Sequence, residues 1–396
     1  MSIIVQKYGG VCLESPEKIK AVAGQLAQLY KQGHRVVAVV SAMGKSTDGL
    51  IKLAYQVSDN PNRRELDMLL TTGERVSMSL LGMALTDLGC AAISFTGSQA
   101  GVLTDSSHSN ARIVEVKPIR LLEELNKNKI VVLAGFQGVH PQSKEITTLG
   151  RGGSDTTAVA MAAALGAERC EIIKEVDGIC SADPRLVTDC KSYSELSYAA
   201  LLDMTFWGAK VLHYRSVELA QSSGVHLVIR KWGTQKDSTV IKQEVQNMEV
   251  GKVLSINSLA RVEHVQVNSG LLADAMEIFG QYLSTQKLPW PQILASATDK
   301  SSTRIAFTAD NEALDTLLRG LSGNKQIQVI KSTLSSVTTT CHGSVGTDLA
   351  QKITEVLKTN QISIDKMILS PLSVTAFIEP AQREKAVQAL HSLIKA

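Results

Sequence analysis

Apolar residues in the first 235 positions of this 396-residue chain fall into two alternating patterns. Short, nearly all-apolar runs predict strands that are buried on both faces, as in a parallel sheet covered by helices. Between these runs, apolar residues recur every three or four positions, which predicts amphipathic helices. We therefore predict an α/β sandwich over residues 1–235, with strands at 3–7, 35–40, 91–95, 129–136 and 170–174.

The first predicted helix has clear start and stop signals. Ser15 and Pro16 are typical of an N-cap and a first helical turn, and Gly33 is typical of the position after a helix. The opening strand–helix–strand order implies parallel strands joined by a right-handed crossover. Further helices are predicted at 65–88, 119–125 and 156–165.

The pattern changes towards the C-terminal half. Residues 231–250 are mostly polar and lack periodicity, which predicts a linker or a domain edge. After them, elements follow in the order strand, helix, two strands, helix, and this order occurs twice. We predict two ferredoxin-like α+β modules, at 250–325 and 326–396, in which residues 253–259 form the first strand of the first module.

Composition and charge add a few exclusions. The chain is 44% apolar and 20% charged, and its net charge of +3 gives no reason to expect nucleic acid or a membrane surface as a partner. No apolar stretch approaches the roughly 20 residues of a membrane helix, and no signal peptide is evident. The six cysteines form no CxxC pair and the eight histidines no HxxxH pair. We therefore expect reduced thiols, no histidine metal site and a cytoplasmic location.

Glycine-rich segments follow three of the predicted strands, at the edge where ligands bind in open α/β sheets. In the first segment, Lys7 precedes Gly9 and Gly10, whose backbone can approach an anion while the lysine supplies positive charge. A simple tight turn explains this segment equally well. The third segment, residues 175–185, contains Asp-Gly and Asp-Pro-Arg turns, which by themselves are ordinary loop signals.

The second segment, residues 148–157, runs into an alanine-rich helix. A helix N-terminus favours an anion, and Arg151 can hold a carboxylate through two parallel hydrogen bonds. An N-cap role would explain Asp155, but not the glycines and the arginine together. The chain lacks the Walker A, GxGxxG, HRD and DFG motifs, so phosphate binding would use another arrangement.

Six motifs in order make the chain similar to the aspartate kinases of the amino-acid kinase superfamily. They are 7–10 (KYGG), 41–48 (SAMGKSTD), 72–75 (TGER), 149–157 (LGRGGSDTT), 176–185 (VDGICSADPR) and 208–213 (GAKVLH). Their order separates the chain from glutamate 5-kinase and UMP kinase, which share the fold. The resemblance implies an amino-acid-kinase-type three-layer sandwich with a mostly parallel sheet.

The same resemblance implies that ATP, with Mg²⁺, phosphorylates the side-chain carboxylate of L-aspartate, which gives 4-phospho-L-aspartate and ADP at the head of lysine, threonine and methionine biosynthesis. Lys7 and Asp155 would be catalytic. Glu74 suits the ammonium group of the substrate and Arg151 one of its carboxylates. The implied substrate-binding residues are Thr47, Glu74, Arg151, Gly152 and Ser154, and the implied nucleotide-binding residues are Lys7, Gly9, Gly10, Ser41, Lys174, Asp183, Arg185 and Lys210.

Some positions depart from the family pattern. Val11 and Cys12 stand where the family usually has threonine and serine, which removes two hydroxyls from the first loop. Lys174 and Glu175 replace a threonine and an aspartate, which adds a positive charge beside the third segment. Cys180 replaces a tyrosine.

The C-terminal modules resemble the paired ACT domains through which this family senses amino acids. This resemblance implies a homodimer or homotetramer formed through these modules, with lysine or threonine as a candidate effector. Dimerisation without any effector is equally consistent with the sequence. Two other functions stay open: a kinase for another acidic amino acid in a specialised pathway, and an amino-acid-sensing regulatory paralogue with weakened catalysis.

Overall fold

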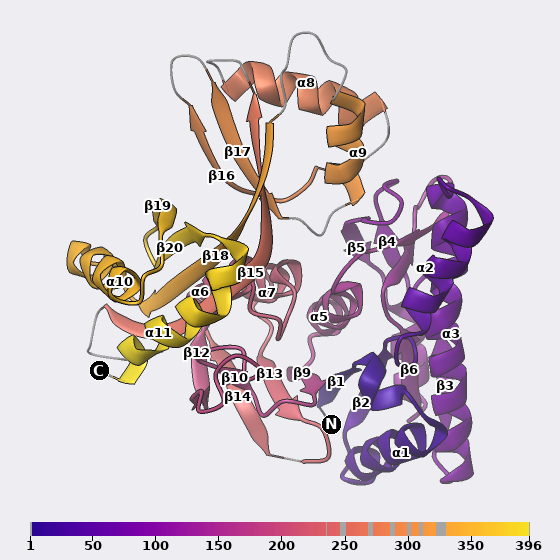
Figure 1. Cartoon of the computed structure of the whole chain (residues 1–396). Coiled ribbons are helices and arrows are strands. Elements are labelled where there is room, and N and C mark those ends of the chain that lie inside the picture. Colours follow the sequence, from indigo (N-terminus) through magenta and orange to yellow (C-terminus); the bar gives the residue numbers. More distant parts are fainter. Residues whose placement is uncertain are drawn as a thin grey trace. The chain divides into compact units, whose positions relative to one another are not determined.

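The computed structural model describes residues 2–234, 236–245, 251–267, 272–285, 290–298, 302–308, 312–321 and 330–395. The chain separates into two compact units, coloured along the sequence in Figure 1. The first comprises residues 1–179, 192–205 and 210–246, and the second comprises residues 180–191, 206–209 and 247–396.

The first unit is built on one large sheet whose strand order is β12-β14-β13-β9-β1-β2-β6-β3. Neighbouring strands are parallel throughout, apart from the antiparallel pair β13 and β14. This arrangement confirms the predicted, mostly parallel sheet. The strands are β1 (Ile3–Tyr8), β2 (Arg35–Val40), β3 (Ala92–Phe95), β6 (Ile130–Ala134), β9 (Arg169–Lys174), β12 (Glu195–Ser197), β13 (Leu227–Lys231) and β14 (Asp237–Lys242).

Helices cover both faces of this sheet, which makes three layers. Ile4 and Tyr8 of β1 share a core with apolar residues of α1 and α3, whereas α5 lies against β1 and β9 on the other face. Side chains alternate along a strand, so Lys7 points to the α5 face. The helices are α1 (Pro16–Lys31), α2 (Ser46–Val57), α3 (Arg63–Asp87), α4 (Ile119–Asn126), α5 (Gly153–Leu165), α6 (Tyr198–Phe206) and α7 (Tyr214–Ser222).

The predicted start of α1 is confirmed: the Ser15 hydroxyl accepts a hydrogen bond from the Lys18 amide at 3.3 Å, and Pro16 opens the helix. The helix α2 was not predicted, because its first turn (Ser46, Thr47, Asp48 and Gly49) consists of residue types that are typical of loops. Its residues are half-buried or exposed. Residues 231–250 were predicted to be a linker or a domain edge, and the first unit does end within them, at residue 246. The linker alternative was wrong for part of the segment. Residues 237–242 form β14, an added strand whose Thr239 and Ile241 are buried.

A small sheet in the first unit positions the loops that follow it. Its strand order is β5-β4-β7-β8, and its members are β4 (Val102–Thr104), β5 (Ile113–Val116), β7 (Gln137–Val139) and β8 (Ile146–Thr148). Runs of three or four residues are too short for a periodic signal, so these strands were not predicted. Strand β8 ends at Thr148, the first residue of the second glycine-rich segment (148–157).

The second unit contains a six-stranded antiparallel sheet with the order β16-β17-β15-β18-β20-β19, as expected for α+β modules. Its strands are β15 (Lys252–Val267), β16 (Ile293–Thr298), β17 (Thr303–Thr308), β18 (Ile330–His342), β19 (Ile364–Leu369) and β20 (Ser373–Ile378). Its helices are α8 (Leu272–Thr285), α9 (Glu312–Leu321), α10 (Thr347–Thr359) and α11 (Arg383–Lys395). The short strands β10 (Ile179–Cys180) and β11 (Ser192–Tyr193) form a separate two-stranded sheet.

The long strand β15 contributes to two cores. Val253 and Ile256 pack in a core with α10 and α11, whereas Val265 and Val267 pack with α8 and α9. The prediction that residues 253–259 belong to the first module was therefore wrong, because their buried side chains complete the core of the second. The predicted module boundary at residues 325 and 326 lies outside the described residues, and the division into domains stays a prediction.

Candidate active site

Two lysines from neighbouring strands meet one carboxylate at the start of α5. Lys7, near the end of β1, lies with its Nζ 2.7 Å from Asp155 Oδ1, and both side chains are buried. Lys174, the last residue of β9, lies with its Nζ 3.6 Å from Asp155 Oδ2. The parallel register of β1 and β9 brings the two strand ends together. Asp155 belongs to the first turn of α5 and makes no cap hydrogen bond, so the N-cap interpretation was wrong.

The electrostatics of this cluster favour an anionic ligand. Burial alone would raise the pKa of Asp155, but the charges of Lys174 and Lys7 outweigh it and lower that pKa. Burial lowers the pKa of Lys174, which the carboxylate of Asp155 opposes. Two ammonium groups beside one carboxylate leave one positive charge without a counter-charge inside the cluster. A phosphate group would supply that counter-charge.

The first glycine-rich loop packs against the loop after β2. A Cβ atom on Gly10 would lie 2.8 Å from the carbonyl oxygens of Ala42 and Gly44, so only glycine permits this approach. The Gly44 amide donates to the Gly10 carbonyl at 2.9 Å, and the Ser41 amide donates to the Tyr8 carbonyl at 3.1 Å. A Cβ atom on Gly9 would lie 3.8 Å from Lys7 Nζ. The predicted residues Lys7, Gly9, Gly10 and Ser41 therefore lie together.

Glu74 reaches the same loop from α3. Its Oε1 accepts a hydrogen bond from the Ala42 amide at 3.1 Å, while its Oε2 is buried without a hydrogen-bond partner among the described residues. Burial raises the pKa of Glu74 to about 7. A buried carboxylate oxygen without a donor is costly unless a ligand supplies one. Thr47, the second residue of α2, follows this loop, and α2 packs on α3.

The second glycine-rich segment turns sharply before α5. Gly150 and Gly152 have φ of 73° and 69°, a left-handed conformation that favours glycine. A Cβ atom on Gly152 would lie 2.1 Å from the Cβ of His213, so this position is closed to other residues. Ser154 is buried in the first turn of α5 with Gly135 against it, and Arg151 is exposed between the two left-handed glycines.

Two residues that hold this segment were not predicted to have a role. The His213 Nδ1 accepts a hydrogen bond from the Arg215 amide at 3.3 Å and caps α7. Burial and the charge of Arg215 lower the pKa of His213, which keeps the ring neutral. The Arg215 guanidinium donates to the Leu149 carbonyl at 2.8 Å. His213 is the last residue of the motif at 208–213 and directly precedes α7. Its place in that motif was the signal that could have indicated a role for it.

Three predicted nucleotide-binding residues are not brought to this cluster within the first unit. Asp183 and Arg185 belong to the second unit, where Arg185 Nη2 lies 2.6 Å from Asp183 Oδ2 and the Arg185 amide donates to Asp183 Oδ1 at 3.0 Å. Lys210 is exposed in the first unit. Their predicted roles are neither supported nor contradicted by these contacts.

The described part of the chain offers neither a cluster of metal ligands nor a membrane-spanning helix. No group of three or more histidine, cysteine, aspartate or glutamate side chains within the described ranges could hold a metal ion. Likewise, no helix in those ranges is long and apolar enough to cross a membrane. None of the six cysteines, which all lie within the described ranges, forms a disulfide, and four of them are buried.

Comparison with known proteins identifies the family. The model of the amino acid kinase family matches residues 2–231. The chain is 41% identical to the aspartokinase of Bacillus sp. (strain MGA3), over 99% of this chain and 97% of that protein. The crystal structure of the Synechocystis aspartate kinase is 34% identical, with a TM-score of 0.56, over 100% of this chain and 69% of that one. Escherichia coli aspartokinase III in complex with aspartate and ADP has the same fold, with a TM-score of 0.84 over the whole of both chains at 21% identity. The chain therefore belongs to the amino acid kinase family and, within it, to the aspartokinases.

Proposed function

We infer that this protein transfers the γ-phosphoryl group of ATP to the side-chain carboxylate of L-aspartate, which forms 4-phospho-L-aspartate and ADP. The observation that carries the inference is the pair of lysines on Asp155, beside two glycine-rich loops and the buried Glu74, whose Oε2 has no hydrogen-bond partner among the described residues. The lysine pair and the glycine-rich loops suit the phosphates of ATP, and Glu74 suits the ammonium group of an amino acid. Their combination in one unit distinguishes an amino-acid kinase from a protein that only binds nucleotides.

The chemistry needs positioning and charge stabilisation rather than a covalent intermediate. A carboxylate oxygen of the substrate attacks the γ-phosphorus in line, and negative charge spreads over the equatorial phosphate oxygens. Lys7 is placed to stabilise that charge, and Asp155 holds the ammonium groups of Lys7 and Lys174 in place. Arg151 would hold one carboxylate of the substrate, with Ser154, Gly152 and Thr47 around it, while Glu74 would accept from the ammonium group.

We propose that Mg²⁺ enters with the nucleotide. Magnesium is commonly bound by substrate phosphates with only one or two protein carboxylates, and the described residues offer no denser set of ligands. The ion would neutralise part of the phosphate charge when bound. Asp183, Arg185 and Lys210 are proposed to contact the nucleotide on the strength of the motifs alone.

The direct test is release of ADP from Mg-ATP, with L-aspartate, L-glutamate and related acids offered in parallel. We expect turnover that is selective for L-aspartate. Turnover with another acid would favour the alternative of a kinase for a specialised pathway. Amino-acid binding without turnover, in protein shown to be folded by circular dichroism, would favour a regulatory paralogue.

The raised pKa of Glu74 predicts that substrate binding releases a proton. With a pKa of about 7, most Glu74 side chains are protonated at pH 6, and binding an ammonium group favours the charged form. We expect L-aspartate to release most of one proton per site at pH 6 from the wild-type protein, and none from Glu74→Gln. Calorimetry in buffers of different ionisation enthalpy measures this number. Equal proton release from both proteins would remove Glu74 from the site.

The same pKa fixes the sign of a stability effect. The folded state holds the Glu74 proton more tightly than the unfolded state, whose carboxyl has an ordinary pKa of 4.5. The free energy of unfolding therefore falls as the pH rises from about 4.5 to about 7. In Glu74→Gln without substrate, the free energy of unfolding should depend less on pH between about 4.5 and about 7. Denaturant unfolding at several pH values measures this dependence.

We also propose that the protein is a homodimer or homotetramer assembled through its ACT-like modules, with lysine or threonine as the candidate effector. The edges of the six-stranded sheet, β16 and β19, carry backbone groups that a second copy could pair with. Inhibition of ADP release by either amino acid would identify the effector, and dimerisation without inhibition would leave the modules a purely structural role. The cytoplasmic location stays a prediction.

A further inference from the structure

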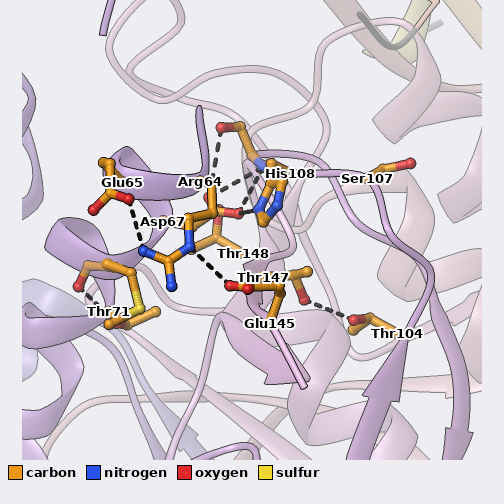
Figure 2. Close-up of polar contacts among 12 residues, drawn as sticks. Arg64, Glu65, Asp67, Thr71, Thr104, Ser107, His108, Glu145, Thr147 and Thr148 are labelled. Atoms are coloured by element: carbon orange, nitrogen blue, oxygen red, sulfur yellow. Dashed lines mark hydrogen bonds and ion pairs between the residues drawn. The ribbon is translucent and has the colours of Figure 1, made fainter. Parts of the chain in front are cut away.

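Asp67 is a buried carboxylate that joins three segments of the first unit, as Figure 2 shows. From β8, the Thr148 hydroxyl donates to Asp67 Oδ1 at 2.6 Å. From the loop after β4, the Ser109 amide donates to Oδ1 at 3.0 Å and to Oδ2 at 3.1 Å, and His108 Nδ1 lies 2.7 Å from Oδ2. The carboxylate itself is on α3, two turns before Glu74. A buried carboxylate is costly unless it is well hydrogen-bonded. Loss of one of these hydrogen bonds is therefore expected to weaken the arrangement of the others.

The loop that Asp67 holds is strained at its contact point. Ser109 has φ of 64°, a left-handed conformation that is unfavourable for a residue with a side chain. The amide of this same residue donates to both oxygens of Asp67, so the carboxylate stabilises the unfavourable turn. Backbone strain that is held by such a buried group often accompanies a functional position.

The strained turn at Ser109 lies directly against the glycine-rich loop at 149–152. A Cβ atom on Gly150 would be 3.0 Å from the Ser109 carbonyl oxygen and from Asn110 Oδ1, so the two loops are in close contact. The Ala111 amide donates to the Thr148 carbonyl at 2.9 Å, which ties the loop after β4 to the end of β8. Arg151 follows Gly150 in the chain. The position of Arg151 therefore depends on contacts that converge on Asp67.

We propose that Asp67 is a positioning residue for the substrate: it fixes the loop at 149–152 and thereby sets the affinity for L-aspartate. This proposal rests on the proposed function and adds a residue to it. A purely structural role for Asp67 is the competing explanation. The two differ in what they predict for the kinetic constants, because loss of loop position weakens aspartate binding, whereas general destabilisation lowers the amount of active enzyme.

The first test removes one contact and leaves the carboxylate in place. Thr148→Val deletes a hydroxyl that donates to a buried carboxylate, a loss that corresponds to about tenfold or more in the equilibrium between the held and the displaced loop. We expect the KM for aspartate to rise by about tenfold, with the KM for ATP and kcat within about threefold of wild type. Thr148→Ser restores the hydroxyl and should restore most of the aspartate affinity. Asp67→Ala removes all three contacts and should raise the KM further.

The matched control is Glu145→Gln. The Arg64 Nε donates to Glu145 Oε2 at 2.8 Å, so this pair also joins α3 to the segment of β8, but both side chains are about 40% exposed (43% and 38%). Exposed ion pairs contribute little, so we expect its kinetic constants to stay within about twofold of wild type. An effect of Glu145→Gln equal to that of Thr148→Val would overturn the proposal, because any link between the two elements would then suffice.

Hydrogen exchange separates this proposal from the proposed function. In Thr148→Val we expect faster amide exchange at 149–152 and 107–111, with little change in α1. If the wild-type protein releases no ADP with aspartate, the proposed function fails, but the exchange result still decides whether Asp67 holds the loop. Unchanged exchange and an unchanged KM for aspartate in folded Thr148→Val would refute the positioning role.

Discussion

Replacement of Lys7 by alanine is expected to lower kcat by roughly 10²–10³-fold, the usual effect of losing one preorganised group that stabilises developing charge. Lys7 has the shorter contact with Asp155, at 2.7 Å, and its side chain is buried at the centre of the cluster. Its loss also leaves Asp155 with Lys174 alone. Single-turnover measurements at saturating ATP and aspartate would separate this loss of chemistry from weaker binding.

The matched variant for Lys7→Ala is Lys174→Ala. Lys174 lies at 3.6 Å from Asp155, and 22% of its side chain is exposed, so its loss should lower kcat by a smaller factor. The reverse order, with a loss of less than about fivefold for Lys7→Ala and a large loss for Lys174→Ala, would assign the main phosphate-stabilising role to Lys174. This comparison also tests the departure from the family pattern at position 174.

Replacement of Arg151 by alanine is expected to raise the KM for aspartate by roughly 10- to 100-fold, because a charge-assisted bidentate pair with a substrate carboxylate would be lost. Arg151 lies between two left-handed glycines, directly before the buried start of α5. The KM for ATP should change little. Initial rates over a wide range of aspartate concentrations, at fixed saturating ATP, measure both constants.

Arg151→Lys is the control for charge alone. Lysine keeps the positive charge but lacks the planar fork of the guanidinium, so it should recover only part of the lost affinity. Full recovery would mean that charge is sufficient and that bidentate geometry is not used. An unchanged KM for aspartate in Arg151→Ala would remove Arg151 from the substrate site.

Much of the first unit could be predicted because its strands are buried on both faces. The runs that became β2 and β6 are almost wholly apolar, and those that became β1 and β9 have apolar residues at most of their central positions. The residues at the ends of β1 and β9 were among those selected for chemistry. Lys7, Gly10 and Asp155 could be placed at one sheet edge from sequence order alone. Their mutual contacts depend on strand register, which the sequence pattern does not determine.

The elements that were not predicted are those whose local sequence signal is weak. The helix α2 has no fully buried residue and opens with loop-like residues, and the strands β4, β5, β7 and β8 are too short to show a period. Asp67, Thr71 and Glu74 lie at i, i+4 and i+7 on one face of α3 and are all buried. A polar stripe of this kind on a buried helix face was a usable signal for the positioning network around Asp67.

The long strand β15 has a consequence for how the C-terminal half folds. It pairs with β18 from Lys252 to Gln266, and the core with α10 and α11 also contains Val337 and Cys341 of β18, so that core cannot be completed before this pair has formed. The closing of this non-local pair, about 80 residues apart in the chain, would then limit the folding rate of that core. Among the described side chains, the core with α8 and α9 takes members from β15 but none from β18. A chain cut at the predicted boundary would lose β18 and leave the central edge of β15 open to pairing with other chains. The two ACT-like modules are therefore joined by one continuous strand, although they have two cores.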